Sequence, residues 1–223
     1  MRLGVKITLV VFAFALLGMA AQPLAVYLKQ RFDARHLVYT APDSSLVRSF
    51  ESQSQSRSII ELQWQALLPD AERDALSQYQ TRSSANTVED VTSNILRSIQ
   101  AASDQNYQAA MYSTNTLDTY NGAAVAMAGF IVPISFHEDQ SPEIVFIVPY
   151  FGACIHFPPP PPNQMVFTKL ASGFTDFELE KAYLVNGLFS QGMFEDPMGT
   201  AAYQLDTVSI RPFVGNPDDF RSH

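Results

Sequence analysis

The sequence is poor in cysteine and in basic side chains, and each shortage excludes a class of protein. Its 223 residues contain one cysteine, Cys154, so no disulfide can form within the chain and the fold must depend on its core. Lys and Arg total 14 against 22 Asp and Glu, which gives a net charge of −8, and no segment concentrates the positive charges. Because nucleic-acid binding requires a basic surface, we expect no nucleic-acid partner.

The most prominent feature that is present is an uncharged apolar segment near the start of the chain, Ile7–Leu28. At 1.5 Å per residue a helix of this length reaches roughly 33 Å, enough to span a bilayer. Alternatively, the small residues around Gly18-Met19-Ala20 mark the end of a cleaved secretory signal. Basic residues nearly balance on the two sides, so the positive-inside rule does not decide the orientation. We expect residues 1–35 to be a signal anchor in the inner membrane, with a single pass and the following domain in the periplasm; the alternative is release into the periplasm after cleavage.

The rest of the chain changes character several times. Asn86, with Glu89 three residues later, has the spacing of a capping box and predicts a helix over 87–101. The expected segments are a polar stalk at 36–58, a helical segment at 59–121, a β-barrel domain at 122–215 and a polar tail at 216–223.

Five apolar runs rich in β-branched and aromatic residues indicate the β-barrel domain. Pro133 and Pro149 lack amide donors and must lie where no ladder bond is needed, and a phase change in the last run predicts a bulge near Asp206. Gly129 and Gly187 suit the sharp curvature of a small barrel. The predicted fold class is α+β, mainly β: a small OB-like five-stranded barrel preceded by short helices and an N-terminal membrane helix, with a β-sandwich as the alternative. The runs occupy residues 122–136, 143–151, 163–170, 182–194 and 199–213.

Cys154 and His156 are two residues apart, so in an extended segment their side chains point to the same face. A thiolate and an imidazole suit zinc, and less closely copper, but a zinc site needs three or four ligands. His137 is the candidate third metal ligand, with Asp139 or Glu143 as further oxygen donors. The alternatives are a buried structural cysteine and a thiol nucleophile, although no nucleophile elbow surrounds Cys154.

Five consecutive prolines follow this pair and must adopt extended polyproline II geometry, which makes the segment stiff. They are either a rigid connector between strands or a docking surface for an aromatic groove of a partner. Aromatic residues on either side, among them Phe151 and Phe167, belong to the core or form an exposed apolar patch. The candidate partner-binding residues are Pro158, Pro159, Pro160, Pro161, Pro162, Asn163 and Gln164.

The segment VPYFGACIHFPPPPPNQMV, preceded by GFIVPISF, resembles an uncharacterised family of bacterial envelope lipoproteins that is classed as a domain of unknown function. The similarity extends over about Ile59–Phe213 and includes IELQWQALLP. It implies a periplasmic, membrane-attached protein encoded with an ABC transporter and, in some cases, with zinc-uptake proteins; it supplies no catalytic residues. Family members often carry a lipid-attachment cysteine after the signal, which this chain lacks because Cys154 is its only cysteine.

These observations together predict a membrane-tethered periplasmic accessory protein of an ABC transport system, acting in zinc homeostasis and not as an enzyme. The expected partners are the inner membrane and an ABC transporter permease or a periplasmic metal-binding protein. The alternatives are an interaction module that uses the proline segment without metal, and a Cys-dependent enzyme.

Overall fold

A computed structural model of the chain describes residues 36–80, 87–152, 159–174 and 176–217. The chain divides into two units, Met1–His36 and Leu37–His223, and the second contains all the described residues except His36. Within the described ranges, no helix has both the length and the apolar character needed to cross a bilayer. The expected membrane segment, Ile7–Leu28, lies outside those ranges.

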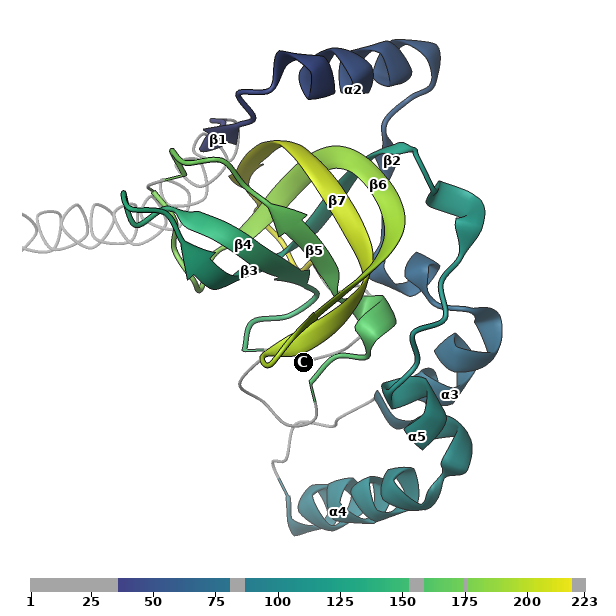
Figure 1. Cartoon of the computed structure of the whole chain (residues 1–223). Helices are drawn as coiled ribbons and strands as arrows, with labels where there is room; N and C mark the ends of the chain where they lie inside the picture. Colours follow the sequence, from purple (N-terminus) through teal and green to yellow (C-terminus); the bar gives the residue numbers. More distant parts are fainter. Residues whose placement is uncertain (1–35, 81–86, 153–158, 175, 218–223) are drawn as a thin grey trace, which may run out of the picture. The chain divides into compact units, whose positions relative to one another are not determined.

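Five strands of the second unit close into a barrel (Figure 1). Neighbouring strands follow the circular order β3-β4-β5-β7-β6 and back to β3, and all pairs are antiparallel except β5 with β7. Strands β3, β4 and β5 form an antiparallel meander, the hairpin of β6 and β7 closes it, and β5 is parallel to β7. This is the OB-like arrangement that the sequence predicts. The strands are β3 (Ala124–Phe136), β4 (Pro142–Val148), β5 (Val166–Lys169), β6 (Ala182–Asp196) and β7 (Gly199–Pro212).

Two very short strands extend this sheet. β1 (Tyr39–Thr40) pairs with the end of β7, and β2 (Ile60–Glu61) runs parallel to the start of β3. Between them lies helix α2 (Ser44–Ser56), whose Phe50 packs on the barrel wall in a small buried cluster. Thus β1 and α2, which belong to the segment expected to be a polar stalk, are packed on the barrel.

The helical segment lies between β2 and β3 in the chain. It comprises the 3-10 turn η1 (Trp64–Leu67), helices α3 (Asp70–Gln80), α4 (Val88–Ser103) and α5 (Gln105–Met111), and the 3-10 turn η2 (Asp118–Tyr120). The predicted helix at 87–101 is therefore present, but its capping box is Thr87 with Asp90, one residue later than predicted.

The main core fills the barrel. It is formed by alternate residues of all five strands and by Trp64, which is 1% exposed and donates its indole N–H to Ala128 O at 2.8 Å. Gly129 allows this approach, because a Cβ there would lie 3.1 Å from the Trp64 ring and 2.7 Å from Ile147. The glycine therefore serves close packing of the indole on the strand.

The predicted irregularities of the strands are also found. The pairing of β6 with β7 skips Val208, so the expected bulge lies two residues from Asp206. Pro133 lies in the part of β3 that pairs only with β4, beside a register shift, and Pro149 follows the end of β4. Both prolines therefore occupy positions where the loss of an amide is tolerated.

Candidate functional site

The described end of the proline segment is fixed against the rest of the chain. Pro159 is exposed, whereas Pro160 and Pro161 are buried. The chain then forms the 3-10 turn η3 (Pro162–Gln164), in which Gln164 N donates to Pro161 O at 2.8 Å. This turn leads into β5, so the position of Pro160 and Pro161 is fixed relative to the barrel.

Gln164 joins this turn to η1. Its side chain is 1% exposed, and its Nε2 donates to Trp64 O at 2.8 Å and to Asn163 O at 3.2 Å. On the other side of η1, the hydroxyl of buried Tyr203 donates to Leu67 O at 2.9 Å and accepts from Leu117 N at 2.8 Å. Burial raises the pKa of the Tyr203 hydroxyl, so it remains a neutral donor. The turn is thus bound to a segment that is itself held to the barrel.

Asn163 has a fully buried side chain with a defined orientation. Its Nδ2 donates to Glu72 Oε2 at 2.6 Å and to the Asn115 carbonyl at 3.1 Å. Both partners are acceptors, so the amide nitrogen must face them and the flipped amide is excluded. Among the described residues, Asn163 Oδ1 has no hydrogen-bond partner.

Glu72, in the first turn of α3, is the centre of this polar network. Its Oε1 accepts hydrogen bonds from Ser113 Oγ at 2.7 Å and Asn115 Nδ2 at 2.6 Å, while Oε2 accepts from Asn163. The carboxylate therefore joins α3, the segment after α5 and the proline turn through hydrogen bonds strengthened by its charge. Sequence reasoning selected Asn163 and Gln164 but missed Glu72, because an acidic residue in a first helical turn is ordinary.

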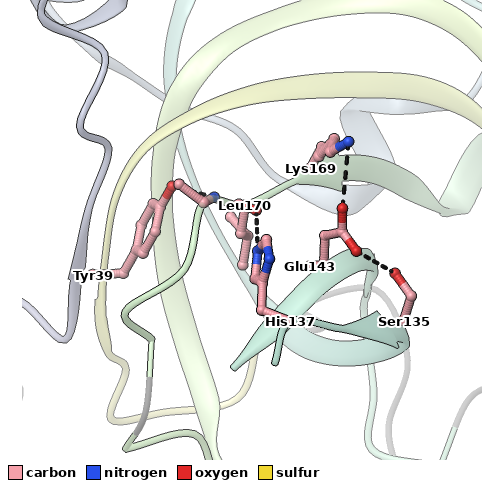
Figure 2. Close-up of polar contacts among 7 residues, drawn as sticks. Tyr39, Ser135, His137, Glu143, Lys169 and Leu170 are labelled. Atoms are coloured by element: carbon pink, nitrogen blue, oxygen red, sulfur yellow. Dashed lines mark hydrogen bonds and ion pairs between the residues drawn. The ribbon is translucent and has the colours of Figure 1, made fainter. Parts of the chain in front are cut away.

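His137 lies in the turn between β3 and β4 and is half-buried (Figure 2). Its Nε2 lies 2.9 Å from Leu170 O, so the ring donates there and, when neutral, carries its lone pair on Nδ1. Zinc-binding histidines are commonly oriented in this way, with one nitrogen bonded to a carbonyl and the other facing the metal.

The two carboxylates expected near His137 are engaged locally. Asp139 Oδ1 accepts from Ser141 Oγ at 2.6 Å and Ser141 N at 3.0 Å, which lowers the pKa of Asp139. Glu143 lies 3.4 Å from Lys169 Nζ and 3.3 Å from Ser135 Oγ (Figure 2). Asp139 therefore has its partner within the β3–β4 turn, and Glu143 has its partners on the neighbouring strands β3 and β5.

The remaining candidate ligands, Cys154 and His156, lie outside the described residues, as does Pro158. Within the described part of the chain, no group of three or more His, Cys, Asp or Glu side chains is arranged to hold a metal ion. That His137 binds the same ion as Cys154 and His156 therefore stays a prediction.

Comparison with known proteins gives a family and a fold. The chain matches no curated protein. It is similar to a solved DUF3299 family protein from Pseudomonas aeruginosa PAO1, with 26% identity, a TM-score of 0.50, and coverage of 71% of this chain and 98% of that one. The profile of a family described as "Protein of unknown function (DUF3299)" matches residues 64–212, a range that includes Trp64, Glu72, Asn163 and Gln164. The chain therefore belongs to the DUF3299 family.

Proposed function

We propose that the chain is a membrane-tethered periplasmic accessory protein of an ABC transport system and that it binds zinc through Cys154, His156 and His137. The observation that carries the metal role is the His137 ring, whose Nε2 donates to Leu170 O at 2.9 Å. This bond fixes the tautomer and leaves Nδ1 as the ligating atom, which is the arrangement of a zinc-bound histidine.

The anchored proline turn supports the same proposal. A metal site loses affinity when its ligands must be ordered on binding, so a ligand pair followed by stiff prolines is partly preorganised. Buried Pro160 and Pro161, together with the bonds of Asn163 and Gln164, fix the C-terminal end of this segment. With Cys154 and His156 as ligands, zinc would be delivered to or received from a transporter partner at the membrane.

Zinc competition with a chromophoric chelator, on the purified full chain in detergent, tests the metal role. We expect one zinc per chain, an affinity at least 100-fold lower for Cys154→Ala or His156→Ala, and roughly 10-fold lower for His137→Ala. His36→Ala, in an exposed histidine, is the matched control and should leave the affinity unchanged. If the wild-type chain and Cys154→Ala hold equally little zinc and copper, the metal role fails.

A second candidate function is a metal-free interaction module, and the exposed side chains beside the proline segment favour it. Phe151 is 44% exposed and lies against Phe130, with ring centroids 6.0 Å apart, and Pro159 is also exposed. Exposed aromatic and proline surface is typical of peptide-docking sites. For this function, Phe151→Ser and Pro159→Ser would abolish co-purification with a permease, and Cys154→Ala would not. For a zinc site, Cys154→Ala would abolish co-purification, and Phe151→Ser and Pro159→Ser would not. A Cys-dependent enzyme stays an untested alternative, because Cys154 lies outside the described residues.

A further inference from the structure

Helix α4 carries an apolar stripe that the rest of the described chain leaves exposed. Val88 is 78% exposed, Ile95 55% and Ile99 58%. At 100° per residue these three side chains and Thr92 fall within an arc of about 60°, flanked by Val91 and Leu96. The charged residues of the helix, Glu89, Asp90 and Arg97, fall outside this arc.

The helix is held at its ends and not by its stripe. Its N-terminus is closed by the capping box of Thr87 and Asp90. Near its C-terminus, Ala101 is buried and its carbonyl accepts from Gln108 Nε2 of α5 at 3.1 Å. Because a 16-residue helix is marginal in water without tertiary packing, burial of the stripe is the main stabilisation that the described structure lacks.

We propose that two copies of the chain pair antiparallel through the α4 stripe, Val88–Ile99, around a two-fold axis between Ser93 and Asn94. This inference goes beyond the proposed function and does not depend on it. The stripe is self-complementary about that axis. It places Val88 opposite Ile99 of the partner, Val91 opposite Leu96, and Thr92 opposite Ile95, so each position of an isologous contact meets an apolar or methyl-bearing side chain.

The area of the stripe is consistent with a weak dimer. Side chains of this size at about half exposure present on the order of 400 Å² of apolar surface, the size of the largest apolar patch on a typical monomer, and such patches are often functional. Two such stripes bury roughly 800 Å², which is below the area of a stable interface and within the range of weak, transient contacts. We therefore expect a concentration-dependent dimer, with a dissociation constant on the order of micromolar.

A lipid surface is the less suitable occupant of this stripe. Helices that lie on membranes carry Lys and Arg on the polar face, whereas α4 has Glu89 and Asp90 against Arg97. A second copy presents the same uncharged stripe and does not need a basic polar face on the helix.

Cysteine cross-linking on the full chain, in a Cys154→Ser background in detergent, tests this geometry. In the antiparallel pair the two Thr92 residues lie about 4–5 Å apart along the helix axes, and the two Val88 residues about 16 Å apart. We therefore expect Thr92→Cys to form a disulfide-linked dimer on mild oxidation and Val88→Cys to form none. Ser93→Cys is the matched control, because it lies beside the axis but on the opposite face of the helix.

Sedimentation of the reduced full chain gives a second measurement. Ile95→Gln with Ile99→Gln should weaken dimerisation at least 10-fold, while helix content is kept because glutamine is a good helix former. Cross-linking at Val88 as efficient as at Thr92 would indicate a parallel pair and overturn the proposal. So would a monomer at 100 µM, or a dye at position 92 that enters an apolar environment only on reconstitution into phosphatidylcholine vesicles.

Discussion

Glu72 is the residue on which the position of the proline turn depends most directly. It accepts hydrogen bonds from Ser113 and Asn115 in the segment after α5 and from Asn163 in the proline turn. Removing the carboxylate would leave the hydroxyl of buried Ser113 and one N–H of buried Asn163 without an acceptor, which costs more than the bonds contribute on balance. The hydrogen bonds of Glu72 therefore favour one position of the proline turn η3.

Replacing Glu72 should destabilise the fold, and a compensating change should restore part of the loss. We expect Glu72→Ala to lower the free energy of unfolding by about 2–4 kcal/mol in urea titrations. Glu72→Gln presents an amide to donors, and Asn163→Asp places a second carboxylate beside Glu72, so each single variant should be destabilised. Combining Glu72→Gln with Asn163→Asp exchanges donor and acceptor, and the double-mutant cycle should show a favourable coupling.

Asp74 is the matched control for this cycle because it is exposed on the same helix. Asp74→Ala should change the free energy of unfolding by less than about 0.5 kcal/mol. Purely additive effects in the Glu72/Asn163 cycle would contradict the direct hydrogen bond at 2.6 Å.

At the scale of elements, α2 packs on the outside of the barrel wall. Phe50 is 8% exposed and forms a buried cluster with Ala124 of β3 and Val208 of β7. Asp43 caps the helix by accepting from Ser45 N and Leu46 N, and it also accepts from Ser45 Oγ at 2.6 Å. The bond from the Ser45 hydroxyl, followed by the two backbone bonds, lowers the pKa of Asp43. These contacts orient the helix so that its one large buried side chain covers the strands.

The stability of Phe50→Ala therefore tests whether α2 packs on the barrel or belongs to an unpacked stalk. We expect it to lower the free energy of unfolding by about 2–3 kcal/mol, because the large side chain leaves a space over Ala124 and Val208 that small residues cannot fill. Glu51→Ala, exposed on the same helix, should have almost no effect in the same thermal or urea measurement. A neutral Phe50→Ala would mean that α2 does not pack on the barrel in solution.

The elements predicted correctly are those with a recognisable pattern of several residues within their own part of the sequence. Apolar runs of seven or more residues identified β3, β4, β6 and β7, and the spacing of a capping box identified α4. The two-residue strands β1 and β2 could not be predicted, because two residues are too few to show an alternating pattern. They are strands only because β7 and β3 are longer than β5 and β4 and expose edges beside them.

The polar network illustrates the same limit for the site. The Asn-Gln pair after the prolines was recognisable as a place where amides bond to nearby carbonyls, and the bond of Gln164 to the Asn163 carbonyl is of that kind. Glu72, Ser113 and Asn115 were not recognisable, because they meet Asn163 only after the barrel and helices have packed. The residues in such contacts are far apart in the sequence, and no regular spacing connects them, so the sequence does not predict the contacts.

At the scale of the whole molecule, acid stability rests on carboxylates that hold turns and helix starts. Asp104 begins α5 by accepting from Tyr107 N and Asn106 N, and its other oxygen accepts from the Tyr79 hydroxyl at 2.9 Å. These hydrogen bonds, with that from Tyr107 first, lower the pKa of Asp104. Asp43 at α2 and Asp139 in the β3–β4 turn have lowered pKa values for the same reason, bonds from Ser45 and Ser141.

A lowered pKa in the folded state gives stability that is present above the unfolded value of 3.8 and is lost as the pH falls through the folded value. We therefore expect the free energy of unfolding to be flat from about pH 7 to pH 5 and to decline below about pH 4. Asp104→Asn keeps an effective helix cap but cannot titrate, so it should make the decline between pH 5 and pH 3 shallower. Urea titrations at these two pH values measure the difference. Equal declines in Asp104→Asn and the wild-type chain would mean that the carboxylate is not hydrogen-bonded as described, and that acid unfolding begins elsewhere.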